Sequence, residues 1–156
     1  MRREFTEQDR TKQGSTASAQ TCARATIGID LPTVDDFSKI EQLSPVALAY
    51  IGDAVYELYI RTYYLMPPMR VADYHNRVVA QVRAETQAVY VEMLQPHFTA
   101  SEKEILRRGR NAAGGKPRRL SGKIYQQATS LETLIGYLYL TDPQRLYELL
   151  TKLELK

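Results

Sequence analysis

Two acidic residues each interrupt an otherwise apolar stretch of the chain. Asp53 lies within Ala49–Glu57 and Glu132 lies within Ala128–Leu140. A carboxylate inside an apolar helix carries a high desolvation cost unless an arginine, a set of hydrogen bonds or a metal ion compensates it. Carboxylate oxygens are also preferred ligands of Mg²⁺. Asp53 and Glu132 are therefore candidate metal ligands and candidate catalytic residues.

A glycine accompanies each of these carboxylates. Gly52 directly precedes Asp53, and Gly136 follows Glu132 at i+4, on the same helix face. Glycine in a helix interior costs roughly 1 kcal/mol relative to alanine, which suggests a close approach to the backbone. Two helices that cross at their glycines would bring Asp53 and Glu132 to one cation. The residues alone leave a second interpretation open, in which each carboxylate pairs with an arginine or caps a backbone amide.

Glu57 is a second candidate for the other ligand. It lies four residues after Asp53 and therefore on the same helix face. Two carboxylates at this spacing can share a cation, but Glu57 can equally be a solvated residue at the edge of the helix. We rank it below Glu132.

Positive charge is concentrated in residues 107–123. This segment holds seven basic and no acidic residues, although the net charge of the whole chain is only +3. A concentrated basic segment is typical of a surface that binds a polyanion such as RNA. A solvated loop that only aids solubility is the alternative, and we favour RNA because the segment leads directly into the helix of Glu132. The candidate phosphate-binding residues are Arg107, Arg108, Arg110, Lys116, Arg118 and Arg119.

The elements that must position these residues are all predicted to be helices. Apolar residues recur with a helical period, proline and serine stand at expected helix starts, and no alternating strand pattern of useful length occurs. The sequence therefore predicts an all-α fold. The expected helices begin near Thr33, span 45–65, 71–94 (with room for a bend), 101–108 (capped by Ser101) and 123–140, and restart at Pro143, with a Gly/Pro/Arg loop over 109–122.

Composition narrows the class of protein. There is a single cysteine, Cys22, and His75 and His97 stand apart, so a zinc site is not expected. No apolar run reaches transmembrane length. Residues 1–30 are polar and predict a flexible tail, and 31–156 predict one domain. We expect a cytoplasmic protein; a plastid location is less favoured, because acidic residues in the tail argue against a transit peptide.

Three segments together resemble the ribonuclease III family. Leu48–Glu57 is similar to the signature helix of that family, and Leu131–Leu140 is similar to its second acidic helix. Arg108–Ala112, the short chain and the lack of a double-stranded-RNA-binding domain after the catalytic one resemble the Mini-ribonuclease III branch. The similarity extends over about residues 43–150.

The resemblance implies a homodimeric, all-helical, Mg²⁺-dependent endoribonuclease with no small-molecule cofactor. It would cut double-stranded RNA, leaving 5′-phosphate ends, and its expected substrate is the stem of large-subunit (23S) ribosomal RNA precursor. Asp53 and Glu132 would be catalytic residues and metal ligands. Ala49 and Thr129 occupy the positions of the two further carboxylates found in full-length members. That difference keeps an alternative open, in which the chain is an inert module that binds structured RNA in a ribosome-associated complex.

Overall fold

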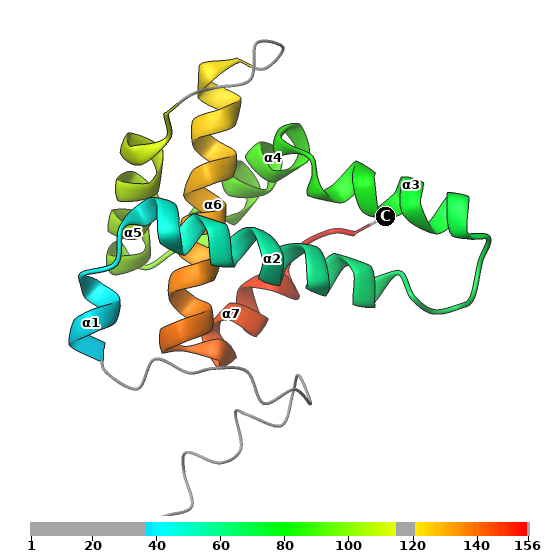
Figure 1. Ribbon diagram of the computed structural model, residues 1–156, viewed down its shortest axis with the longest axis horizontal. Coiled ribbons are helices and arrows are strands. Elements are labelled where there is room, and N and C mark those ends of the chain that lie inside the picture. Colours follow the sequence, from blue (N-terminus) through cyan, green and yellow to red (C-terminus); the bar gives the residue numbers. More distant parts are fainter. Residues whose placement is uncertain (1–36, 115–120, 156) are drawn as a thin grey trace, which may run out of the picture. The chain divides into compact units, whose positions relative to one another are not determined.

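The computed structural model describes residues 37–114 and 121–155, and every regular element among them is helical. This confirms the all-α prediction for the described part of the chain, which belongs to one compact unit, Pro32–Lys156. The elements are shown in Figure 1. They are α1 (Phe37–Glu41), α2 (Pro45–Tyr63), α3 (Val71–Val82), α4 (Ala84–Leu94), the 3-10 turn η2 (Gln95–His97), α5 (Ala100–Ala112), α6 (Gly122–Thr141) and α7 (Pro143–Leu150).

Helix α6 is the central element of the fold. It contacts α1, α2, α4, α5 and α7, and α2 crosses it at the front of Figure 1. Its leucines Leu131, Leu134 and Leu138 are at most 4% exposed and pack in the main apolar core. A helix that is buried on several sides must be apolar around most of its circumference. A carboxylate on α6 is therefore an exception that needs a reason.

Serine caps begin the two long helices, as the sequence predicts for α2. The Ser44 hydroxyl accepts a hydrogen bond from the Ala47 amide at 3.1 Å, with Pro45 in the first turn. The Ser121 hydroxyl does the same for the Ile124 amide at 3.2 Å. Each cap satisfies an amide that the helix itself leaves unpaired.

The predicted limits of α5 were wrong at both ends. The helix is capped by Thr99 and Glu102, which form a reciprocal capping box, and not by Ser101. It also continues beyond the predicted end at residue 108 through Gly109 to Ala112, so Arg110 lies on a helix and not in a loop. Gly109 does not break the helix because it serves as a contact point: a Cβ there would lie 3.0 Å from the Ser130 Cα on α6.

The expected helical region 71–94 is two helices. Arg83 has an extended conformation (φ −67°, ψ 151°) and separates α3 from α4. The Arg83 guanidinium donates to the Thr86 hydroxyl at 3.1 Å, and that hydroxyl donates to the Ala80 carbonyl oxygen at 2.7 Å. These bonds use polar groups at the break and fix the turn between the two helices.

Several expectations fall on residues outside this description. The tail predicted for residues 1–30, the helix start at Thr33 and residues 115–120 of the Gly/Pro/Arg loop lie there. Within the described ranges, no helix is both long enough and apolar enough to span a bilayer.

Candidate active site

Helices α2 and α6 touch backbone to backbone at the two predicted glycines. A Cβ placed on Gly52 would collide with the carbonyl oxygen of Glu132 and would lie 2.8 Å from the Gly136 nitrogen. A Cβ on Gly136 would collide with the carbonyl oxygen of Leu48. The crossing inferred from the sequence is therefore present, and it sets Asp53, next to Gly52, beside the turn of α6 that carries Glu132.

The two carboxylates are electrostatically coupled. Burial, followed by the nearby charge of Asp53, raises the pKa of Glu132 to about 7, while a hydrogen bond from Gln87 acts in the opposite direction. Burial, followed by the charge of Glu57, raises the pKa of Asp53. Glu132 is half-buried, whereas Asp53 is exposed in the single chain, contrary to the expectation of two buried carboxylates. No arginine of the described residues is among the groups that shift the pKa of either carboxylate, so the pair is a candidate site for a cation.

Glu57 is engaged elsewhere. Its Oε1 accepts hydrogen bonds from Arg61 at 3.1 Å (Nε) and 2.5 Å (Nη2), one helical turn away. This ion pair is largely exposed to solvent. The structure therefore favours Glu132 over Glu57 as the partner of Asp53. Across residues 37–114 and 121–155 no group of three or more His, Cys, Asp or Glu side chains could hold a metal ion, so the candidate centre is a pair.

The described basic candidates lie on the last turns of α5. Arg107 is ion-paired with Glu104 at 2.6 Å, and both side chains are more than half exposed. Arg108 is half-buried and Arg110 is exposed. An exposed ion pair contributes about 0–1 kcal/mol, so Arg107 can exchange Glu104 for a phosphate at low cost. The remaining candidates, Lys116, Arg118 and Arg119, lie outside the described residues.

Comparison with known proteins decides the family. The model of the ribonuclease III domain family matches residues 46–143, most of the described chain. The chain belongs to the ribonuclease III family. Mini-ribonuclease 3 from Synechocystis sp. is 58% identical over 120 residues, which cover 77% of this chain and 84% of that protein. Mini-ribonuclease 3 from Synechococcus sp. is 59% identical over 113 residues, covering 72% of this chain and 82% of that protein.

A solved structure agrees with this assignment. The crystal structure of a protein from Fusobacterium nucleatum matches with a TM-score of 0.65 and 30% sequence identity, covering 69% of this chain and 90% of that one. The chain is thus an endoribonuclease of the Mini-ribonuclease 3 type with the all-helical ribonuclease III domain fold. These matches favour the enzyme over the inert RNA-binding module.

The sequence resemblance places two further carboxylates of full-length ribonuclease III enzymes at positions 49 and 129. Both positions are buried in this chain. Ala49 is 7% exposed and Thr129 is 8% exposed. The Thr129 carbonyl accepts a hydrogen bond from the Thr133 hydroxyl at 2.7 Å. Because both positions are packed, a longer acidic side chain at either would need room that this ribonuclease III domain does not offer in its present packing.

Sequence reasoning missed Gln87, a buried polar residue of α4 that is among the groups shifting the pKa of Glu132. Its side chain is 1% exposed, and its Nε2 donates to the Val82 carbonyl oxygen at 2.9 Å. Its Oε1 is buried without a hydrogen-bond partner. A glutamine among the apolar residues of an amphipathic helix was the available signal, because an unpaired buried amide is costly.

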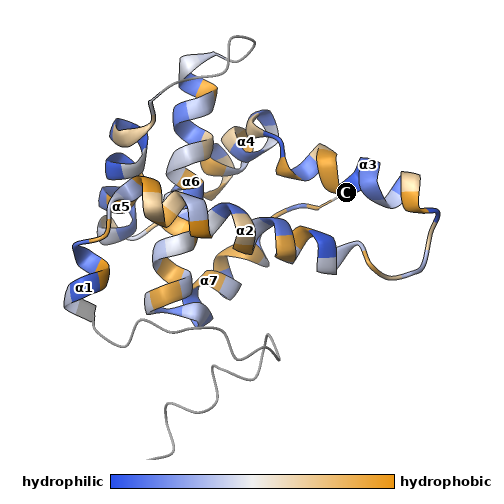
Figure 2. Cartoon of the chain, in the orientation of Figure 1, coloured by the Kyte–Doolittle hydropathy of each residue, from blue (hydrophilic) through white to orange (hydrophobic). Residues whose placement is uncertain are grey.

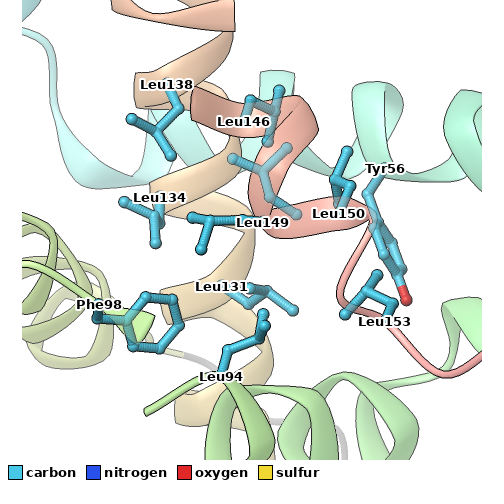
Figure 3. A pocket seen from close by; sticks show the side chains of 11 residues that line it. Tyr56, Leu94, Phe98, Leu131, Leu134, Leu138, Leu146, Leu149, Leu150 and Leu153 are labelled. Atoms are coloured by element: carbon cyan, nitrogen blue, oxygen red, sulfur yellow. The ribbon is translucent and has the colours of Figure 1, made fainter. Parts of the chain in front are cut away.

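The one described cavity is not a second candidate for the site. It is a small gap in the apolar core, enclosed mainly by leucines of α6 and α7, as Figure 3 shows. Tyr56 and Phe98 complete its lining, and neither Asp53 nor Glu132 takes part. The α2–α6 crossing therefore remains the candidate site of this ribonuclease III domain.

Proposed function

We propose that the chain is a Mg²⁺-dependent endoribonuclease that cleaves double-stranded RNA, with Asp53 and Glu132 as its catalytic metal ligands. The observation that carries the proposal is the Gly52–Gly136 crossing, which brings together two carboxylates whose pKa values are both raised, that of Glu132 in part by the charge of Asp53. Family membership supports an endoribonuclease, and the coupled pair indicates where its chemistry takes place.

The pair fits a hard divalent cation. Asp53 and Glu132 offer oxygen ligands alone, and Mg²⁺ binds through one or two carboxylates while keeping several waters. A bound cation would also offset the repulsion from Asp53 that helps to raise the pKa of Glu132, and no described arginine or lysine is hydrogen-bonded to Glu132 in its place. When bound, Mg²⁺ supplies an activated water and stabilises the charge that develops on the scissile phosphate.

The residues of the chain have separate roles around this site. Glu132, on a buried helix, provides a ligand whose backbone is fixed by the contact with Gly52. Asp53, exposed on α2, would provide the second ligand from the side of the site that is open to solvent. The Cys and His residues do not enter the proposal: Cys22 lies outside the described residues, and neither histidine lies among the groups that shift the pKa of Asp53 or Glu132.

The basic residues of α5 and of the segment that follows it would hold the RNA backbone. Arg108 and Arg110 lie two helical turns beyond the capping box of α5, toward the start of α6. A-form RNA is recognised mostly through its shape and phosphates, which suits arginine side chains on a helix end. If Arg107, Lys116, Arg118 and Arg119 join them, binding should weaken steeply with salt.

We further propose that two copies pair through the outer face of α2. Four large apolar residues are exposed there: Val46 (58%), Tyr50 (82%), Ile51 (41%) and Leu58 (46%). Their spacing places them on the side of α2 opposite its buried residues, and Figure 2 shows apolar residues along this helix. An exposed apolar stripe of this kind favours an interface, and a dimer would present two sites to the two strands of a duplex.

Within this function, the precursor of large-subunit (23S) ribosomal RNA is the proposed substrate, as the sequence resemblance to the Mini-ribonuclease III branch implies. We propose the cytoplasm as its location, because that precursor would be processed there. No small-molecule cofactor is required by the two-carboxylate site.

Cleavage of a long RNA duplex tests the proposal. Wild type is compared with Asp53→Asn and Glu132→Gln, with and without Mg²⁺, and Glu57→Gln serves as the matched control because its carboxylate is bound to Arg61. We expect Mg²⁺-dependent cutting that both site substitutions abolish while duplex binding remains and the control cuts normally. Salt-sensitive duplex binding without any cutting by wild type would instead leave the inert RNA-binding module.

The dimer has its own test. Tyr50→Lys places a charge in the centre of the proposed interface, and Val89→Lys places the same charge on an exposed apolar position of α4. Sedimentation should show a dimer for wild type and for the α4 control, and a monomer for Tyr50→Lys. A wild-type protein that is monomeric at micromolar concentration would contradict the dimer.

A further inference from the structure

Asp53 lies at the border of the exposed apolar stripe on α2. Tyr50 precedes it by three residues and Val46 by seven, so the three side chains share one side of the helix. Tyr50 is 82% exposed and Val46 is 58% exposed, although both are large apolar residues. Side chains three residues apart on a helix have Cβ atoms about 5–6 Å apart, so whatever covers Tyr50 also approaches Asp53.

The charge of Asp53 is not compensated by its neighbours. Within residues 37–114 and 121–155 its carboxylate forms no hydrogen bond and no ion pair, whereas Glu57, one turn further along the same side of α2, is bound to Arg61. Glu132 lies across the helix crossing and adds a second negative charge. The single chain therefore presents a carboxylate pair of which one member is open to solvent.

A second copy on the α2 stripe would cover this open side. Two identical chains that pair through one surface are related by a two-fold axis, and residues near the axis lie close to their own counterparts. Tyr50 is the most exposed large apolar residue of the stripe, which favours a position near the axis. The Asp53 carboxylates of the two copies would then lie at the edge of one shared interface.

The consequence of covering this side is electrostatic. When protein replaces the water beside two carboxylates, the effective dielectric constant falls, and both their mutual repulsion and their attraction to a cation grow. Without a cation, pairing therefore adds to the repulsion among the Asp53 and Glu132 charges of both copies. A divalent cation at each site offsets that repulsion, so cation binding and pairing favour each other.

We propose that metal binding and dimerisation are coupled at this site: the second subunit closes the open side of the Asp53–Glu132 pair, and the bound cation in turn stabilises the dimer. The inference rests on the proposed function, since it takes the two carboxylates as Mg²⁺ ligands and α2 as the interface. Such coupling is reciprocal and is usually about 5–150-fold. Because a dimer holds two sites, Mg²⁺ binding that is about fivefold tighter in the dimer requires dimerisation that is about 25-fold tighter at saturating Mg²⁺.

Sedimentation of the wild-type protein over a dilution series, at pH 8 and without RNA, measures the coupling. The dissociation constant of the dimer is compared in EDTA and in saturating Mg²⁺, with NaCl added to the EDTA sample to match the ionic strength. We expect it to be about 25-fold or more lower in Mg²⁺. If the dimer is too tight for sedimentation, the rate of subunit exchange between two labelled preparations is measured instead, and Mg²⁺ should slow it.

Substitutions of single carboxylates assign the effect to the site. Asp53→Asn and Glu132→Gln should make dimerisation independent of Mg²⁺. Asp53→Asn should also dimerise more tightly than wild type in EDTA, because it removes the uncompensated charge. Glu57→Gln is the matched control, since Glu57 lies on the same side of α2 but is bound to Arg61. It should keep the Mg²⁺ dependence of the wild type.

The reverse measurement uses a chain with a weakened interface. Ile51→Ser combined with Leu58→Ser removes exposed apolar area from the stripe without adding charge, and Val89→Ser makes the same kind of change on α4. Calorimetry should show that the double variant binds Mg²⁺ about fivefold or more weakly than wild type, and that Val89→Ser binds it equally well. Circular dichroism confirms that both variants keep their helices.

Four results would overturn the inference. Equal dissociation constants in Mg²⁺ and EDTA, for a wild type that binds Mg²⁺, would remove the coupling and leave the proposed function intact. The same Mg²⁺ effect in Asp53→Asn would show general screening of charge. A wild type that binds no Mg²⁺ would overturn the inference together with the proposed metal site, and one that stays monomeric in Mg²⁺ would overturn it together with the proposed dimer.

Discussion

Replacing Glu132 by glutamine should stabilise the metal-free protein at neutral and alkaline pH. Glu132 is half-buried, and burial together with Asp53 raises its pKa from the ordinary 4.5 to about 7. A raised pKa means that the folded state favours the protonated form. The stability that Glu132 contributes is therefore fully present below pH 4.5 and is lost as the pH rises through about 7.

The size of the effect follows from the shift. Each pKa unit corresponds to 1.36 kcal/mol, so the shift of Glu132 amounts to at most about 3 kcal/mol at pH 8. Glu132→Gln removes this penalty because its side chain is neutral at every pH. The free energy of unfolding of the variant should exceed that of wild type by at most about 3 kcal/mol at pH 8 and by roughly 1 kcal/mol at pH 5.5, with no difference at pH 4.

Urea denaturation in EDTA, at matched protein concentrations from pH 4 to pH 8, measures this difference. Excess Mg²⁺ should narrow it, since a ligand at a hundred times its dissociation constant stabilises the wild-type fold by about 2.7 kcal/mol. Glu57→Gln should change stability by less than about 1 kcal/mol, because it removes an exposed ion pair. A Glu132→Gln variant that is less stable than wild type at pH 8, or whose advantage is the same at every pH, would refute the reasoning.

Two further predictions concern the framework of the site. Gly52→Ala should destabilise the fold by about 3 kcal/mol or more in thermal melts, because its Cβ would meet the backbone of α6. Gly114→Ala is the control: a Cβ there has no atom within 4 Å, so stability should change by less than about 0.5 kcal/mol. Equal melting temperatures for the two variants would contradict the crossing of α2 and α6. Arg145→Met should cost about 3 kcal/mol at pH 7, because it leaves the 5%-exposed Glu102 without the guanidinium that binds it at 2.7 Å. Burial alone would raise the pKa of Glu102, but hydrogen bonds from Arg145 and the Thr99 amide hold it below its ordinary value. The loss of stability in Arg145→Met should therefore fade as the pH falls below about 4.5. A loss that is constant with pH would show that the substitution removes packing and not a charge interaction.

The crossing of the two acidic helices could be predicted because its signal is local. Gly52 and Gly136 each stand beside a carboxylate in an apolar helix, and both glycines proved to be backbone contact points. The start of α2 could be predicted for the same reason, since Ser44 and Pro45 form a cap from adjacent residues.

Other features depend on partners distant in the sequence. Gly109 was expected to be the first residue of a loop, but it lies within α5, where Ser130 and Thr133 of α6 are in close contact with it. Asp53 was expected to be buried, yet it lies on the flank of α2 between the core and the exposed apolar stripe. The hydrogen bond from Gln87 to the Val82 carbonyl oxygen depends on the break at Arg83, and no local sequence pattern indicates that break.

The contact between Gly52 and Gly136 also bears on how the sequence can change. Because α2 and α6 meet through backbone atoms, the separation of the two carboxylates does not depend on the size of any core side chain. Exchanges among the leucines of α6 and α7 can alter stability while the spacing of the site stays the same. Consider a library of variants randomised at the leucine positions of α6 and α7 and at positions 52 and 136, and selected for folding. The leucine positions should accept varied apolar residues, whereas the selected variants should all keep glycine at positions 52 and 136.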